Sequence, residues 1–209
     1  SVLAKVTDVE DYYLLNLTSD DAGEFFREFR IFLGAEGGNL QIRGIYDKSQ
    51  EAVFEGGVLV DAFHVARTPA LAQILSLASL EGLNNVLQGQ GITFVGFEAP
   101  FKYQEGAVNL SRARAWGPAL GITINGEFNR RNDDVSLSGR LVPAYTINKV
   151  LGAIPLLGDL LVGEGVFAID YEVAGNTQQP IITVNPLSAL TPGFLRGIIF
   201  GFESEGAGP

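Results

Sequence analysis

The chain has no cysteine and no methionine, and it has one histidine and one tryptophan in 209 residues. Without cysteine, disulfides, zinc thiolate sites and thiol nucleophiles are excluded, and His64 alone cannot build a two-histidine metal site. Neither a GxSxG nucleophile elbow nor a phosphate-binding P-loop is present. The sequence therefore predicts no catalytic centre, no metal site and no cofactor. The lack of methionine also leads us to expect a segment of a longer or processed protein.

Basic residues are scarce: the chain has 14 Lys and Arg against 24 Asp and Glu, which gives a net charge of −10. Phosphate backbones are bound by clustered Lys and Arg, so nucleic acid is excluded as a partner. Long apolar runs are missing too, since no window reaches the roughly 18 residues of a spanning helix. The most hydrophobic stretch, residues 148–162, is interrupted by the charged residues Lys149 and Asp159. Any membrane anchor is therefore expected outside this segment.

What the chain does have is strand periodicity, with 26 Gly and 14 Phe. Residues 2–17 predict a strand, and 36–47 and 54–65 predict strands entered through Gly-Gly turns. From 92 to 142 apolar residues alternate with a period of two between short polar turns, which predicts an antiparallel meander. Further strands are expected near 167–173 and 181–184.

The alternation within the meander places nine apolar side chains on one face of the predicted sheet. Parity leaves open whether that face is a closed core or an open groove. The nine residues are Phe94, Val108, Leu110, Ile122, Ile124, Phe128, Val135, Leu137 and Leu141.

Three helices are predicted, at about 19–33, 69–88 and 146–162. In the first, Ser19 is the expected N-cap, and Phe25, Phe29 and Phe32 form an aromatic stripe at i, i+4 and i+7 that ends at Gly34. The second begins with Thr68 as its cap and Pro69 at the first helical position, and its broad apolar arc is typical of a core helix. The third is kinked, because Pro155 cannot donate to the carbonyl of residue 151.

The third helix carries the most specific hypothesis, a kinked amphipathic hairpin over 148–162 that contacts acyl chains or a membrane interface. Ile154, Leu156, Leu157 and Leu160 are its candidate contact residues. In the alternative interpretation, Leu151, Ile154, Leu157 and Leu161 cover the sheet.

Polar candidates for chemistry have simpler explanations. Asp20/Asp21 and Asp159/Glu164 resemble acid–base pairs but fit helix capping and solvated loops better. Asp133 and Asp134 fit a solvated turn, and His64 fits a structural strand position. Trp116, on the strand parity of Arg112 and Arg114, suits either packing or contact with a headgroup or sugar.

An ordered set of segments carries a resemblance to a known family. The segments are SDDAGEFFREFRIFLGAEGGNLQIRG, RTPALAQILSLASLEGLNNVLQGQGITF, WGPALGITINGEFN, GRLVPAYTINKVLGAIPLLGDLLVGEGVFAIDYEVAG and NPLSALTPGFLRGIIF, from about residue 19 to 200. In this order they resemble the C-terminal region of the AsmA-like bacterial envelope proteins, in particular the long YhdP-type branch.

The resemblance implies a curved antiparallel sheet forming a U-shaped apolar groove, covered or capped by amphipathic helices, in a mainly β fold. It also implies a periplasmic segment of an inner-membrane-anchored protein of Gram-negative bacteria that transfers phospholipid towards the outer membrane. The implied partners are phospholipid acyl chains, the membrane interface and an envelope protein. An alternative function is a structural end-cap that docks a partner in outer-membrane assembly.

Overall fold

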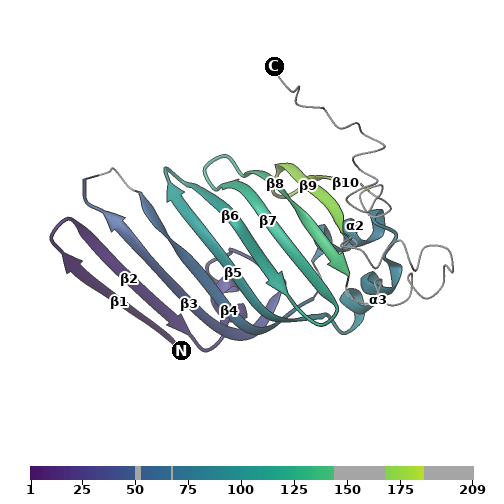
Figure 1. The fold of residues 1–209 in the computed structure, drawn as a ribbon, viewed down its shortest axis with the longest axis horizontal. Coiled ribbons are helices and arrows are strands. Elements are labelled where there is room, and N and C mark those ends of the chain that lie inside the picture. The colour runs from purple at the N-terminus through teal and green to yellow at the C-terminus, as the bar shows by residue number, and fades with distance from the viewer. Residues whose placement is uncertain (50–52, 67, 144–167, 186–209) are drawn as a thin grey trace, which may run out of the picture.

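The computed structural model describes residues 1–49, 53–66, 68–143 and 168–185. Its strands form one antiparallel sheet in which every strand lies beside its neighbours in sequence, so the order runs from β1 to β10 without a crossover (Figure 1). The sheet is open and curled. The strands are β1 (Val2–Val9), β2 (Tyr12–Ser19), β3 (Ala35–Asp47), β4 (Phe54–Val65), β5 (Ile92–Gln104), β6 (Ala107–Trp116), β7 (Leu120–Asn129), β8 (Asp134–Pro143), β9 (Ile169–Asn176) and β10 (Ile181–Asn185).

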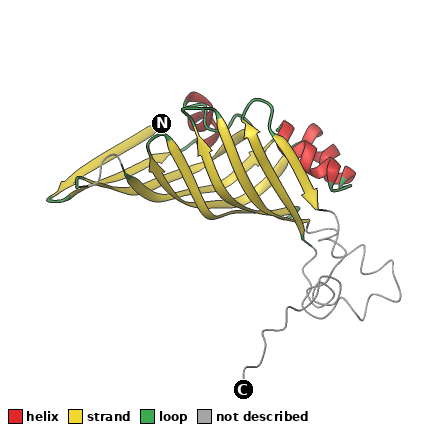
Figure 2. Ribbon diagram, turned by 90° about the horizontal axis from the view of Figure 1, so that it is seen from above, coloured by secondary structure: helices red, strands yellow, loops and turns green. Residues whose placement is uncertain are grey.

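In the described part of the chain, three helices interrupt this succession: α1 (Ala22–Glu28), α2 (Pro69–Leu77) and α3 (Glu81–Gly89). The first lies between β2 and β3, and the other two lie between β4 and β5. Both connections are at the same end of the strands, which we call the helix end. The tight turns of β1–β2, β5–β6, β7–β8 and β9–β10 lie at the opposite end, the hairpin end. Figure 2 shows all three helices on the same side of the sheet.

The prediction of a mainly β fold with an antiparallel sheet and helices is confirmed. The meander is present as β5 to β8, and the same sheet continues through all the flanking strands. Residues 2–17 do not form a single strand, because the chain turns at Glu10 and Asp11 and pairs β1 with β2. The Gly-Gly pairs at 37–38 and 56–57 lie within β3 and β4, not in turns before them.

The first predicted helix is shorter than expected. It begins at Ala22, because Asp21 caps it by accepting a hydrogen bond from the backbone N–H of Glu24 at 2.8 Å. It ends at Glu28, so Phe32 lies beyond the helix. Arg30 takes the left-handed conformation (φ 52°) that closes a helix, the place that the sequence had suggested for Gly34.

The second predicted helix is two helices. The carbonyl of Ile74 accepts from the N–H of Ala78, and Ser79 then adopts φ 58°, which breaks the helical path before α3. The break lets both helices turn apolar residues into one core with the strands of the helix end. That core includes Leu75, Leu83 and Leu87 together with Phe94, Leu120, Leu141 and Ile169.

Candidate functional site

The inner face of the sheet is the face whose side chains join the helices in the core. Directly paired residues in antiparallel strands share a face, so the register defines this face from strand to strand. One row near the helix end joins Leu40, Val60, Phe97, Ala115, Ile122, Leu141 and Ile169. A row near the hairpin end joins Tyr13, Tyr46, Phe54, Tyr103, Val108, Phe128 and Val135.

The face nominated from sequence parity coincides with this inner face for the eight residues between Val108 and Leu141. Val108 pairs with Phe128 and Phe128 with Val135, while Ile122 pairs with Leu141. Leu110 and Leu137 both lie opposite Gly126, and Ile124 lies between these rows. The ninth residue, Phe94, stacks on Phe63 with ring centroids 5.3 Å apart.

An irregularity in β6 at Arg112 keeps the apolar residues on either side of it on the inner face. Arg112 adopts φ 54° and its N–H donates to the side-chain oxygen of Asn125 at 2.7 Å. The register shifts there, so Leu110 and Ala113, three residues apart, both belong to the inner face. The pairing of β5 with β6 is irregular in the same region, between Glu98 and Phe101.

On the inner face of β2 to β7, side chains at the hairpin end are more exposed than those at the helix end, whereas on β8 and β9 Val135 and Val173 stay buried, at 8% exposed each. At the helix end Leu40, Val60 and Leu141 are at most 2% exposed. At the hairpin end Tyr13, Tyr46 and Tyr103 are 37–38% exposed, although they belong to the same face. Half-buried apolar side chains occur in every part of this face; they include Leu110, Ile122, Ile124, Phe128 and Leu137.

The two ends differ because the helices fill only one of them. At the helix end α1 packs against β3 and β4, and apolar residues of α2 and α3 join the same buried core. Of the hairpin-end row, Tyr13, Tyr46 and Tyr103 do not belong to that core, whereas Val135 does. Aromatic rings partly compensate there. The ring of Phe54 lies over Gly44, where a Cβ would come within 2.4 Å of it, and it meets Phe101 at a centroid distance of 5.3 Å.

The outer face carries ion pairs between neighbouring strands, together with the exposed apolar side chains of Leu14, Ile45, Leu59 and Trp116. Arg114 contacts Glu98 at 2.7 Å, Lys102 contacts Glu55 at 2.9 Å and Arg140 contacts Asp170 at 2.7 Å. The six side chains are 33–62% exposed, so solvent screens each pair and each contributes little to stability. These charged side chains determine which face of the sheet is solvated, because burying them would be costly. The inner rows of β2 to β9 carry no charged side chain among the described residues.

Tyr171 is a polar group on the inner face that is 6% exposed. Its hydroxyl donates to the carbonyl of Thr123 at 2.9 Å, and its ring lies over Gly139. Burial raises the pKa of Tyr171 well above its ordinary value near 10. The phenol therefore stays protonated, which suits a structural tie between β9 and β7 and not an acid–base group.

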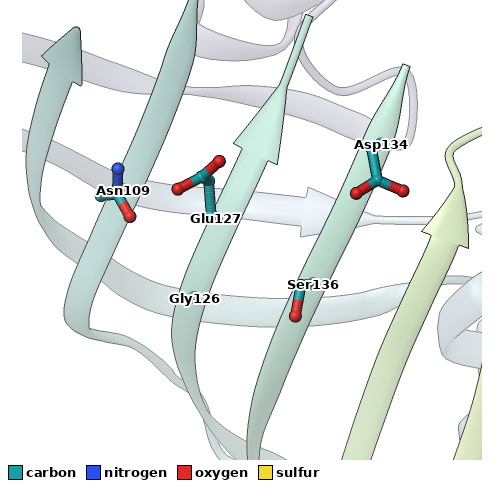
Figure 3. Close-up of a pocket in the computed structure, with 5 residues that line it drawn as sticks. All are labelled: Asn109, Gly126, Glu127, Asp134 and Ser136. Atoms are coloured by element: carbon teal, nitrogen blue, oxygen red, sulfur yellow. The ribbon is translucent and has the colours of Figure 1, made fainter. Parts of the chain in front are cut away.

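A shallow hollow of about 340 Å³ on the outer face is lined by Asn109, Gly126, Glu127, Asp134 and Ser136 (Figure 3). Its two carboxylates and two neutral side chains offer oxygen ligands, but the described residues bring no three His, Cys, Asp or Glu together in a metal-binding group. Asp133, which the sequence assigned to a solvated turn, precedes β8 with φ 52°.

The remaining polar candidates have structural environments. His64 Nε2 lies 3.1 Å from the hydroxyl of Thr93 on the neighbouring strand. The Trp116 indole packs on Gly96, where a Cβ would come within 2.4 Å of the ring. The Arg114 guanidinium lies 5.5 Å from the Trp116 ring centroid. Asp20 pairs with the N-terminal amine, which lowers the pKa of Asp20 through their hydrogen bond.

The hairpin predicted over 148–162 lies outside the described residues, and with it the candidates Ile154, Leu156, Leu157 and Leu160. The same holds for Asp159 and Glu164. Among the residues that the structure describes, no helix is long and apolar enough to cross a membrane.

Comparisons with protein families, with curated proteins and with solved structures find no match to this chain.

Proposed function

We propose that the chain is a non-enzymatic module that binds and transports phospholipid, with acyl chains lying along the inner face of the sheet. The observation that carries this proposal is the change of burial along that face. Uncharged rows continue across the strands, yet beyond the helix end Leu110, Phe128 and Leu137 are half-buried and the three tyrosines are exposed, while Val135 and Val173 stay buried. Extended apolar surface that a protein leaves uncovered is typical of a site for an apolar ligand.

In this proposal the inner face is the lining of a U-shaped groove, and α2 and α3 cap it at the helix end. An acyl chain needs apolar contacts and no hydrogen bonds, which agrees with rows that contain aliphatic and aromatic side chains. The tyrosines Tyr13, Tyr46 and Tyr103 suit the boundary, because a phenol presents an apolar ring and a polar tip. The sequence resemblance to the AsmA-like, YhdP-type proteins supports the same function and a periplasmic location between the inner and outer membranes.

A second candidate function is a structural end-cap that docks an envelope protein partner. The observation that favours it is the close packing of the helix end, where the side chains of Leu40, Val60 and Leu141 are fully buried. If the whole inner face is filled in solution by the chain's own side chains, no ligand has room.

Lipid extraction followed by mass spectrometry of the purified protein separates the two functions. The transport module is expected to carry phospholipid, and Leu137→Asn is expected to reduce the amount bound because it places an amide among the apolar rows. Ser138→Asn is the matched control, since the neighbouring residue faces outward. Protein that carries no phospholipid, or equal loss in both variants, would reject the transport module in favour of the end-cap.

A further inference from the structure

Residues 29–33, which we call the apolar tip, form the most exposed apolar segment between β2 and β3. Phe29 is 55% exposed, Ile31 56%, Phe32 40% and Leu33 72%. Side chains of this size usually lose most of their surface to a core or an interface. Four of them in five consecutive residues therefore indicate a surface that meets something other than water.

The apolar tip is held in one conformation by its backbone. The N–H of Arg30 donates to the carbonyl of Arg27 at 3.0 Å, and the N–H of Ile31 donates to the carbonyl of Phe26 at 2.8 Å. These two bonds make a Schellman motif, in which the residue after the cap adopts the left-handed conformation. The base of the tip is fixed as well, because the Arg27 guanidinium donates to the carbonyl of Ala35 at 2.7 Å. The tip is therefore preorganised, and binding would cost little conformational entropy.

Arg30 occupies the left-handed position of this motif with φ 52°, where glycine is the favoured residue. Six other described non-glycine residues also have a positive φ, so what distinguishes Arg30 is its place among exposed apolar side chains. Arg30 is exposed and takes part in none of the ion pairs formed among the described residues. It is also the only charged residue of the tip, in a chain with an acidic excess.

We infer that the apolar tip inserts into the interface of a bilayer that contains anionic phospholipid, with Arg30 bound to lipid phosphate. A guanidinium among apolar side chains matches both layers of such an interface, since it pairs with phosphate while its neighbours enter the acyl boundary. A protein partner fits less well. Four half-exposed side chains of this size offer roughly 400 Å², about half of the roughly 800 Å² that one partner contributes to a stable interface.

This inference does not depend on the inner face binding lipid, because the tip belongs to the β2–β3 connection. Co-sedimentation with vesicles of phosphatidylcholine and phosphatidylglycerol in equal parts tests it on the 209-residue chain. Ile31→Ser with Leu33→Ser is expected to weaken vesicle binding about tenfold or more, given the apolar area removed. Leu77→Ser with Val86→Ser removes two comparably exposed apolar side chains from α2 and α3 and is expected to bind as the unaltered protein does.

Arg30→Gly separates membrane binding from folding, because glycine relieves the backbone strain. This variant is expected to remain folded and to bind phosphatidylglycerol vesicles no better than vesicles of phosphatidylcholine alone. Three results would overturn the inference: no vesicle binding by the unaltered protein, equal binding by the Ile31/Leu33 double variant, or self-association through the tip in analytical ultracentrifugation. If the Leu137→Asn variant carries less phospholipid but still binds vesicles, the result bears on the proposed function of the inner face and leaves the inference about the apolar tip standing.

Discussion

Truncating one leucine at each end of the inner face should affect stability very differently. Leu141 is fully buried at the helix end, so Leu141→Ala removes its transfer free energy and leaves a cavity, at a cost of about 3 kcal/mol. Leu137 lies on the same strand and face, but it is only half-buried and its opposite neighbour on β7 is Gly126. Leu137→Ala should cost only about 1 kcal/mol, because roughly half of its area stays in water and no closed cavity forms.

Urea unfolding followed by circular dichroism measures both costs. The midpoint is expected to fall much further for Leu141→Ala than for Leu137→Ala, with the slope of the transition unchanged in both variants. Lipid-free protein is needed, because a bound ligand adds its own binding free energy to stability. If the two variants lose equal stability, the inner face is uniformly packed and the distinction between its ends is wrong.

Three further predictions concern single residues. Arg30→Gly should raise the free energy of unfolding by about 1 kcal/mol by removing left-handed strain, and a lowered melting temperature would contradict this. Tyr171→Phe should cost about 1 kcal/mol at neutral pH through the lost bond to Thr123. Because folding raises the pKa of Tyr171, its stabilising effect is complete below pH 10 and is lost as the pH rises above it; the phenylalanine variant should therefore lose less stability in alkali, and parallel pH curves would reject this. Gly139→Ala should unfold the protein or greatly destabilise it, because the new Cβ would lie 1.9 Å from the Thr123 carbonyl oxygen, whereas Gly57→Ala has open space and should be nearly neutral in thermal melts.

The sequence predicted the central part of the sheet because its signals there are local. Alternation from Ile92 to Pro143 specified four strands and, through parity, the face shared by Val108, Phe128 and Val135. The same reasoning extended to the β3 and β4 segments. It failed at the hairpin of β1 and β2, where Glu10 and Asp11 turn the chain without glycine or proline.

The helices show what local patterns could not supply. Arg30 and Ser79 both adopt the left-handed conformation that sequence rules assign to glycine, so the ends of α1 and α2 were missed. The exposure of Phe29 and Phe32 was missed for the same reason, because a longer helix would have turned that stripe inward. Burial along the inner face depends on which strands the helices cover, and that is a property of the assembled sheet.

The central claim is that phospholipid lies on the inner face, and photocrosslinking from neighbouring positions tests it most directly. A photoreactive phenylalanine analogue at Tyr103 or Phe128 would face inward, while the same group at Lys102 or Glu127 would face outward. The protein is expressed in Gram-negative cells, irradiated, and analysed by mass spectrometry for attached phospholipid. We predict crosslinks to phospholipid from the two inward positions and none from the two outward ones. Equal labelling of both faces, or no labelling from Tyr103 and Phe128, would contradict the account.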